Sequence, residues 1–246
     1  MGKFELKLTE VLQAYRVVDL SEKVVQETSA DPTGERRWYF IRMFPYPTHQ
    51  VGGEWMHMIV MESHIGTHVE APAHWIDSKE NREGAGKDIT GVPLESYYGE
   101  AVLIKCDKFS DGYAIKPQDL KDQGVAENDI VIFGLSGREA HKGKAPYLSD
   151  EVISYMADLP IKMVGFDRTV GAEDMPKYLA EADTRKRFLG MTMHKTFCNR
   201  EIPIIEGIGN LNQLTKKRFV LFAWPARMGG LEAFVTRAVA FEPTDE

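Results

Sequence analysis

The sequence predicts an α+β fold, or a loosely wound α/β one, with a mixed sheet or barrel and helices packed outside it. Three observations favour this class. Nine short segments are rich in β-branched or aromatic residues, few helical patterns lie between them, and no repeat or low-complexity linker interrupts the 246 residues. We expect one main domain over residues 17–246, preceded by a helical extension over residues 1–16.

The first predicted elements are a helix and nine strands. Residues 4–15 place apolar side chains at helical spacing, which predicts an amphipathic helix that could cap the core or contact another subunit. The strands are predicted from runs of β-branched and aromatic residues. They cover residues 17–20, 38–44, 55–61, 101–106, 130–133, 162–166, 203–205, 219–224 and 234–241.

Three further helices and one loop are predicted between the strands. Residues 117–123 and 149–158 have helical patterns, and Ser149 is well placed to accept a backbone N–H as the N-cap of the second. A third helix is expected over residues 185–193. Residues 78–93 are rich in Gly, Asn and charged side chains, which is typical of a loop.

Composition excludes several classes of function. The chain has 37 acidic and 30 basic residues, a formal charge of −7, and no long run of Lys or Arg, so we expect no nucleic-acid partner. No stretch reaches the roughly 20 apolar residues of a membrane span, so no membrane anchor is expected. The two cysteines, Cys106 and Cys198, are far apart. Neither a disulfide framework nor a thiolate zinc site is indicated, and the cytoplasm is the expected compartment.

Residues 64–74 carry the pattern most informative about chemistry. Four potential metal ligands, His64, His68, Glu70 and His74, all occupy even positions. On an extended chain they would project to one side, because side chains alternate with a period of two. Gly66, Pro72 and the β-branched Thr67 and Val69 argue against one continuous helix, although His64 and His68 alone would share a helical face.

These residue types suit catalysis by a bound metal ion. Imidazoles with one carboxylate match zinc or manganese, and three protein ligands leave a coordination position open for water. Such an ion brings the pKa of its water towards ~7 and polarises a carbonyl, both of which amide and ester hydrolysis need. His74, beyond the trio His64, His68 and Glu70, could take the proton from the water and return it to the leaving group.

A second candidate pair of ligands lies downstream. His194 and Glu206 would not be singled out by spacing alone. Glu206 closes an apolar run, however, where a charged carboxylate is costly unless it is paired. A second metal ion would be such a partner.

The motif HxGTHxExPxH over residues 64–74 resembles the signature of the metal-dependent cyclase superfamily, which includes bacterial kynurenine formamidases and isatin hydrolases. His194 and Glu206, followed by Gly207, Asn210 and Leu211, are similar to the family in order and spacing. A weaker resemblance runs from residues 18–20 through 164–167 to the end of the chain, so it covers nearly the whole sequence.

This resemblance implies a fold, an assembly and site roles. The fold would be a swivelling β/β/α domain with a barrel-like mixed sheet, assembled as a homodimer or homotetramer. His74 would be the proton donor and acceptor. Two overlapping ligand sets are implied: His64, His68 and Glu70 for a first ion, and Glu70, His194 and Glu206 for a second where two are present.

The sequence departs from the family pattern in two places. Glu70 stands where the family usually has Asp, and the extra methylene moves the carboxylate by roughly an ångström, against a tolerance of about 0.2 Å in metal–ligand distances. The number of ions, one or two, is therefore left open. Residues 36–39 and 44–47 also replace a compact Trp-Pro-Gly element expected of a formamidase, which leaves the substrate open.

Other polar residues are more simply explained by structure. We expect a structural role for His57, with substrate contact as the alternative, and solvated positions for His49 and His141. Arg138 and Arg168 could each orient a substrate carboxylate, but a surface charge is the simpler expectation.

Several aromatic residues precede the motif. They could form a wall for a planar substrate, although core packing explains each of them individually. They are Trp38, Tyr39, Phe44, Tyr46 and Trp55.

Together these observations predict an enzyme acting on a small molecule. The main hypothesis is a metal-dependent hydrolase that cleaves an amide or cyclic amide C–N bond of a small aromatic substrate. One alternative is a lactone or ester hydrolase of aromatic degradation. Another, of a different class, is a non-catalytic metal-binding scaffold, against which His74 weighs because a structural site needs no base.

Overall fold

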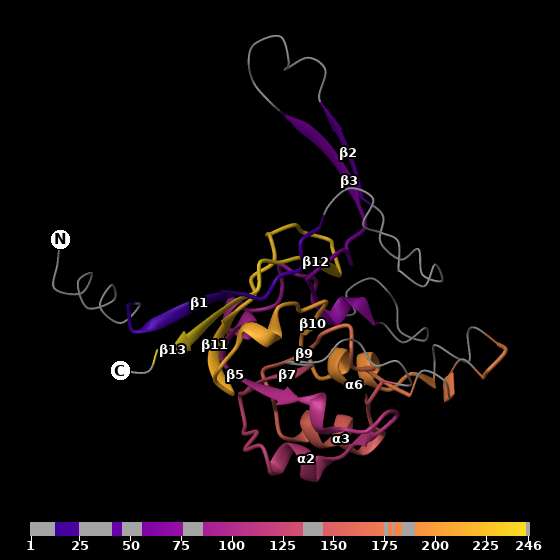
Figure 1. Ribbon diagram of the computed structural model, residues 1–246. Coiled ribbons are helices and arrows are strands. Elements are labelled where there is room, and N and C mark those ends of the chain that lie inside the picture. Colours follow the sequence, from indigo (N-terminus) through magenta and orange to yellow (C-terminus); the bar gives the residue numbers. More distant parts are fainter. Residues whose placement is uncertain are drawn as a thin grey trace.

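Nine strands of the described chain form one curled mixed sheet in the computed structural model (Figure 1). The structure describes residues 13–24, 41–45, 56–75, 86–134, 145–174, 177–178, 180–183 and 190–244. The strands are β1 (Tyr15–Asp19), β4 (His68–Glu70), β5 (Tyr98–Lys105), β7 (Ile130–Gly134), β9 (Met163–Phe166), β10 (Ile204–Glu206), β11 (Arg218–Phe222), β12 (Ala233–Val235) and β13 (Val239–Pro243). Their order is β1-β13-β11-β5-β7-β9-β10-β4-β12. The expected mixed, barrel-like sheet is confirmed.

The centre of the sheet is parallel and its flanks are antiparallel. Strands β5, β7, β9 and β10 pair in parallel, whereas β10–β4 and β4–β12 on one side and β5–β11, β11–β13 and β13–β1 on the other are antiparallel. All five residues of β7 and all four of β9 are buried. Their uninterrupted apolar sequences are typical of strands covered on both faces.

Helices cover one face of the sheet. The helices α2 (Pro117–Lys121), α3 (Asp150–Asp158) and α6 (Met193–Asn199) lie together beside β7 and β9 (Figure 1). Val131 of β7 packs with these helices, while its neighbours Ile130 and Ile132 belong to the core on the other face. None of the helices described is long and apolar enough to cross a membrane.

Two small sheets complete the described architecture. Strands β6 (Ala114–Ile115) and β8 (Tyr147–Leu148) pair in parallel, and β2 (Ile41–Pro45) pairs antiparallel with β3 (His57–Met61). The β2–β3 pair projects away from the nine-stranded sheet (Figure 1). No further strand pairs with β2 or β3 among the residues described. Four consecutive residues of β3 are exposed.

A buried carboxylate on β13, the strand next to the edge strand β1, links three parts of the sheet. Glu242 of β13 forms an ion pair with Arg16 of β1 and accepts the backbone N–H of Thr215 at 2.6 Å and that of Lys216 at 2.5 Å. Its side chain is 1% exposed. This carboxylate therefore joins β1, β13 and the segment that leads into β11.

Of the four expected helices, the one over 117–123 is confirmed as α2, which ends at Lys121. The helix expected over 149–158 is confirmed, and Ser149 accepts the backbone N–H of Val152 at 3.2 Å as its N-cap. Most of the helix expected over 4–15 lies outside the described residues, and its last residue, Tyr15, instead begins β1. Residues 185–189 of the helix expected over 185–193 are also outside them, and the helix that is described there begins at Met193.

One strand prediction was wrong in its extent. The strand expected over 234–241 is two strands, β12 and β13, at different positions in the sheet. Tertiary hydrogen bonds redirect the chain between them. Thr236 donates its N–H to the Thr67 carbonyl at 2.9 Å, and Ala238 accepts the N–H of Leu20 at 2.9 Å.

Candidate metal centre

Four histidines and two glutamates from separate elements converge beside β4. Strand β4 carries two of them, and its antiparallel pairing with β10 places Glu206 opposite His68. The others lie in the turn before β4, in the 3-10 helix η2 (Pro72–His74) after it, and in the first turn of α6. The six residues are His64, His68, Glu70, His74, His194 and Glu206.

The convergence within residues 64–74 has a different cause from the one expected. One extended strand was predicted to project the four ligands to one side, but β4 spans only His68–Glu70. Before it, Gly66 has φ +59°, and after it Pro72 starts a 3-10 turn that ends at His74. A left-handed turn and a 3-10 turn therefore bring His64 and His74 back towards Glu70.

The Gly-Thr pair of the motif fixes this turn. A Cβ on Gly66 would lie 2.3 Å from Cγ2 of Val24. Buried Thr67 donates its hydroxyl to the Gly207 carbonyl at 2.5 Å and accepts the N–H of Glu22 at 2.8 Å. Since Gly207 directly follows Glu206, this hydroxyl holds together two segments that carry residues of the cluster.

Glu70 lies at the centre of the cluster. Its Oε1 is 3.5 Å from His64 Nε2, 3.6 Å from His68 Nε2 and 3.6 Å from His74 Nε2. Its Oε2 faces the other way and lies 3.4 Å from His194 Nε2. One oxygen of this carboxylate thus faces three imidazoles, and the other oxygen faces the fourth.

His194 also faces a second carboxylate. Its Nε2 lies 3.5 Å from Glu206 Oε1 as well as 3.4 Å from Glu70 Oε2. The side chains of Glu70 and His68 are 2% and 1% exposed, whereas those of His64, His74 and Glu206 are 27%, 22% and 30% exposed. Solvent therefore reaches the cluster on the side of His64, His74 and Glu206, whereas the side of His68 and Glu70 is buried against the sheet.

The distances fit shared metal ligands better than hydrogen bonds. N–H···O hydrogen bonds measure about 2.7–3.2 Å, and the N···O distances around Glu70 are 3.4–3.6 Å. Two ligands bound at about 2.0–2.1 Å to one tetrahedral ion lie roughly 3.3 Å apart. His68 Nε2 and Glu70 Oε2, which both face the cluster, are also buried without a hydrogen-bond partner, an arrangement that is costly unless an ion pairs with such atoms.

Glu70 belongs to both groups of donors that could hold an ion. One group is His64, Glu70 and His74, and the other is His68, Glu70 and Glu206, with the ligand atoms of each lying within 4.8 Å of one another. Geometry thus adds His74 to the donors near His64 and brings His68 close to Glu206. Neither group contains His64, His68 and Glu70 together, the three residues expected to bind the first ion.

The orientation of His68 is set by the backbone. Its Nδ1 lies 2.9 Å from the Gly66 carbonyl oxygen, which can only accept a hydrogen bond. Nδ1 therefore carries a proton, and in the neutral ring the lone pair of Nε2 points at the cluster. A histidine ligand oriented through its other nitrogen is the usual arrangement in metal sites.

The cluster also sets the charges of its members. Burial opposes ionisation of Glu70, but His194, His68 and His74 outweigh it and hold the pKa of this carboxyl well below its usual range. Burial likewise opposes protonation of His194, yet Glu70 and Glu206 raise its pKa well above the ordinary value.

The pKa values of the two more exposed histidines, His64 and His74, shift downwards, opposite to that of His194. Burial lowers the pKa of His64 and of His74, and the nearby Glu70 only partly offsets this. Both are therefore neutral at neutral pH. A neutral imidazole can bind an ion or accept a proton.

Sequence reasoning missed several residues around the cluster. Trp75 stacks on His194 with ring centroids 5.6 Å apart and an interplanar angle of 26°. Glu173, 2% exposed, accepts the N–H of Met193 at 2.7 Å where α6 begins. Adjacency to His74 is a signal that could have identified Trp75, whereas the contact of Glu173 spans 20 residues and leaves no local signal.

Other candidate residues do not join the cluster. His57 is exposed on β3, and Phe44 is exposed on β2. Arg168 donates to both carboxylate oxygens of Glu22 at 2.6 and 2.7 Å, which agrees with a structural ion pair. The remaining candidates lie outside the described residues: Trp38, Tyr39, Tyr46, His49, Trp55, Arg138 and His141.

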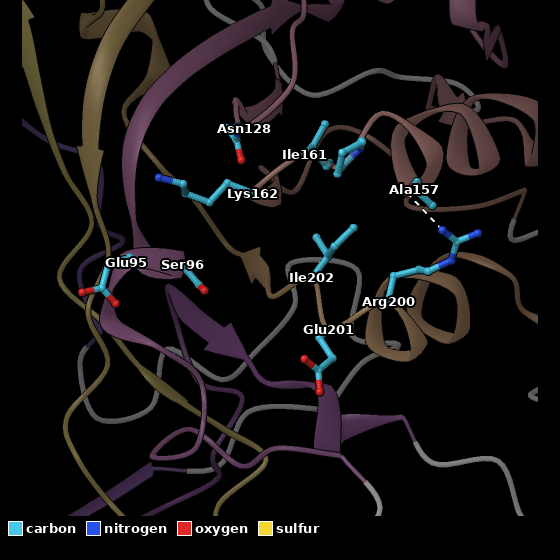
Figure 2. Close-up of a pocket in the computed structure, with 10 residues that line it drawn as sticks. Glu95, Ser96, Asn128, Ala157, Ile161, Lys162, Arg200, Glu201 and Ile202 are labelled. Carbon is cyan, nitrogen blue, oxygen red and sulfur yellow. Dashed lines mark hydrogen bonds between the residues drawn. The ribbon is translucent and has the colours of Figure 1, made fainter.

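A separate pocket of about 450 Å³ lies at the opposite end of α6 and β10 (Figure 2). Its walls carry Lys162 and Arg200 together with Glu95 and Glu201. Lys162 donates to the Tyr98 carbonyl at 3.2 Å, and Arg200 forms a 3.0 Å ion pair outside the pocket lining. These cations serve the fold, and the pocket contains none of the six clustered residues.

The chain has recognisable relatives. The family model described as "Putative cyclase" matches residues 7–172. Kynurenine formamidase from Salinibacter ruber is 25% identical over 193 residues, covering 75% of this chain and 79% of that protein. The corresponding enzyme from Erythrobacter litoralis is 24% identical over 190 residues, covering 76% of this chain and 77% of that protein.

Solved structures share the fold. Isatin hydrolase A from Labrenzia aggregata superposes with a TM-score of 0.72 at 20% identity, covering 99% of this chain and all (100%) of that one. A potential metal-dependent hydrolase with cyclase activity gives a TM-score of 0.67 at 22% identity, covering 94% of this chain and 100% of the other. With the family model matching well over half of its length, the chain belongs to the putative cyclase family.

Proposed function

We propose that this chain is a metal-dependent hydrolase that cleaves an amide or cyclic amide C–N bond of a small aromatic substrate. Membership of the family and similarity to kynurenine formamidases indicate a metal-dependent amidohydrolase-like enzyme. The observation that carries the proposal is buried Glu70, whose two oxygens face four imidazole nitrogens at 3.4–3.6 Å.

We propose two divalent ions, zinc or manganese, with Glu70 shared between them. His64 and His68 would complete the set at Oε1, and His194 and Glu206 the set at Oε2. Imidazole and carboxylate donors suit these metals. When bound, such ions polarise a carbonyl oxygen and lower the pKa of water.

The chain itself supplies proton transfer through His74. Its side chain is 22% exposed, and burial lowers its pKa, so the imidazole is neutral and can accept a proton at neutral pH. Its Nε2 lies 3.6 Å from Glu70 Oε1, which places the ring beside the proposed metal ligands. His74 would receive the proton of the attacking water at one nitrogen and return it to the leaving amine nitrogen.

A matched substrate panel tests the reaction. Metal-loaded protein would be assayed with an aryl formamide, a cyclic aromatic amide and the corresponding aromatic lactone, and Glu70→Gln would serve as the control. We expect faster turnover of an amide than of the lactone, and loss of turnover after chelation or in the variant. Faster lactone hydrolysis would favour the esterase alternative, and metal binding without turnover of any of them would favour a scaffold.

Exposed apolar side chains on β3 and two buried free cysteines bear on the assembly and the cellular compartment. We propose a homodimer or homotetramer, because Met58, Ile59 and Val60 on the projecting β3 are 46–54% exposed and a two-stranded sheet cannot bury them itself. A change in sedimentation of Ile59→Glu to a smaller species would support this. A cytoplasmic location is supported by Cys106 and Cys198, which are both buried and unpaired.

A further inference from the structure

A side-chain network that includes none of the proposed metal ligands contacts Nδ1 of His64, the ring nitrogen that faces away from Glu70. The hydroxyl of Ser63 lies 3.0 Å from His64 Nδ1 and 2.7 Å from Glu232 Oε1. The same carboxylate oxygen is 3.7 Å from His64 Nδ1. Neither Ser63 nor Glu232 belongs to the groups of donors that could hold an ion.

Donor and acceptor chemistry gives this network one direction. A carboxylate only accepts hydrogen bonds, so the Ser63 hydroxyl donates its proton to Glu232. The oxygen of Ser63 is then free to accept, and His64 Nδ1 must carry the proton that it donates. The remaining nitrogen, Nε2, keeps its lone pair on the side that faces Glu70 Oε1 at 3.5 Å. In this structure the lone pair accepts a hydrogen bond from His74 Nδ1 at 3.0 Å, and a bound ion would take the place of that bond.

The backbone holds Glu232 in register with the cluster. The carbonyl of Glu232 accepts the N–H of Ala71 at 2.7 Å, and the next residue, Ala233, pairs with Glu70 in the β12–β4 ladder. The strand that positions the central carboxylate therefore also positions the carboxylate behind His64.

We propose that Ser63 and Glu232 are positioning residues that hold His64 as its Nδ1–H tautomer and direct Nε2 towards a metal ion. This rests on the proposed function only in requiring that the cluster bind metal. The Gly66 carbonyl fixes the tautomer of His68 in the same way, so each of these two histidines has its own partner on the nitrogen that faces away from the ion.

The test is titration of metal-free protein with zinc or manganese, followed calorimetrically. Removing a partner that orients a ligand typically weakens metal affinity about 10–100-fold. We expect such a loss in Ser63→Ala and in Glu232→Ala, and a smaller one in Glu232→Gln, whose amide oxygen still accepts from the hydroxyl. Exposed Glu95, outside the cluster, provides the matched control Glu95→Ala and should leave affinity unchanged.

A His64→Ala background separates positioning from a general structural effect. There, adding Ser63→Ala should cause no further loss of affinity for any ion still bound, because the hydroxyl has no imidazole to orient. Thermal unfolding of each metal-free variant checks that the fold is retained.

The outcomes distinguish the two proposals. Wild-type protein that binds no ion would overturn both the proposed function and this inference. Wild-type protein that binds ions while Ser63→Ala and Glu232→Ala bind them equally well would overturn the inference alone. An equal loss from Ser63→Ala with or without His64 would also overturn it.

Discussion

Replacing Thr67 by Val removes a hydroxyl while nearly keeping the shape of the side chain. Thr67 is 3% exposed, and its oxygen makes two hydrogen bonds, to the Gly207 carbonyl at 2.5 Å and from the Glu22 N–H at 2.8 Å. Each such bond contributes a net 0.5–1.5 kcal/mol or so, and a partner left buried and unpaired costs about as much or more. The expected loss in the free energy of unfolding is therefore about 1–3 kcal/mol.

Thermal unfolding of metal-free protein measures this loss. In a chain of this size, 1 kcal/mol corresponds to roughly 2–4 °C in Tm, so a loss of about 2 kcal/mol lowers Tm by about 4–8 °C. Thr67→Ser keeps the hydroxyl and should recover most of the difference. Thr90→Val, which removes an exposed hydroxyl bonded to Asp88 at 2.8 Å, should change stability by less than about 0.5 kcal/mol. Equal Tm values for Thr67→Val and Thr90→Val would refute the role assigned to this hydroxyl.

Three further predictions concern the turn, the base and the sheet edge. His74→Ala should keep bound metal but lose roughly 10²–10⁴-fold in turnover, and normal turnover would remove His74 from proton transfer. Gly66→Ala should lower the free energy of unfolding by about 2–5 kcal/mol through left-handed strain and the clash with Val24, whereas Gly229→Ala, which meets nothing within 4 Å, should be nearly neutral. Burial opposes ionisation of Glu242, but its hydrogen bonds lower its pKa below the ordinary 4.5, so its stabilisation is present above that value and is lost as pH falls through the folded-state pKa. Glu242→Gln should accordingly be less stable than wild type at pH 7, with a difference that shrinks in acid, and a difference independent of pH would contradict this.

The fold could be predicted where local pattern and tertiary environment agree. The apolar runs of β7 and β9 lie in the centre of a sheet that is covered on both faces, so their sequence alone identifies them. The division between β12 and β13 could not be predicted, because residues between them follow hydrogen bonds to Thr67 and Leu20 rather than a local turn signal.

The start of α6 shows the same limit. Met193–Asn199 has no strong local start signal, and its Thr192 N-cap makes no side-chain capping bond. The first turn is instead held by Glu173, which accepts the Met193 N–H from 20 residues away. A helix whose end is fixed by a distant buried carboxylate is placed by the tertiary structure.

The candidate site was largely predictable because four of its six residues are clustered in sequence. The motif over 64–74 identified His64, His68, Glu70 and His74, and the structure brings all four together. The reason expected for their convergence, an alternating strand, was wrong, because Gly66 and a 3-10 turn bend the chain. Glu232 was missed because only the β12–β4 pairing brings it near His64.

Metal content per chain, measured on protein purified without chelator alongside His68→Ala, tests the central claim most directly. The shared position of Glu70 predicts two zinc or manganese ions per wild-type chain. The variant should lose or weaken binding, because His68 Nε2 is a buried nitrogen without a hydrogen-bond partner among the described residues and lies in one of the groups that could hold an ion. A wild-type chain that holds no metal, even after incubation with zinc or manganese, would contradict the account.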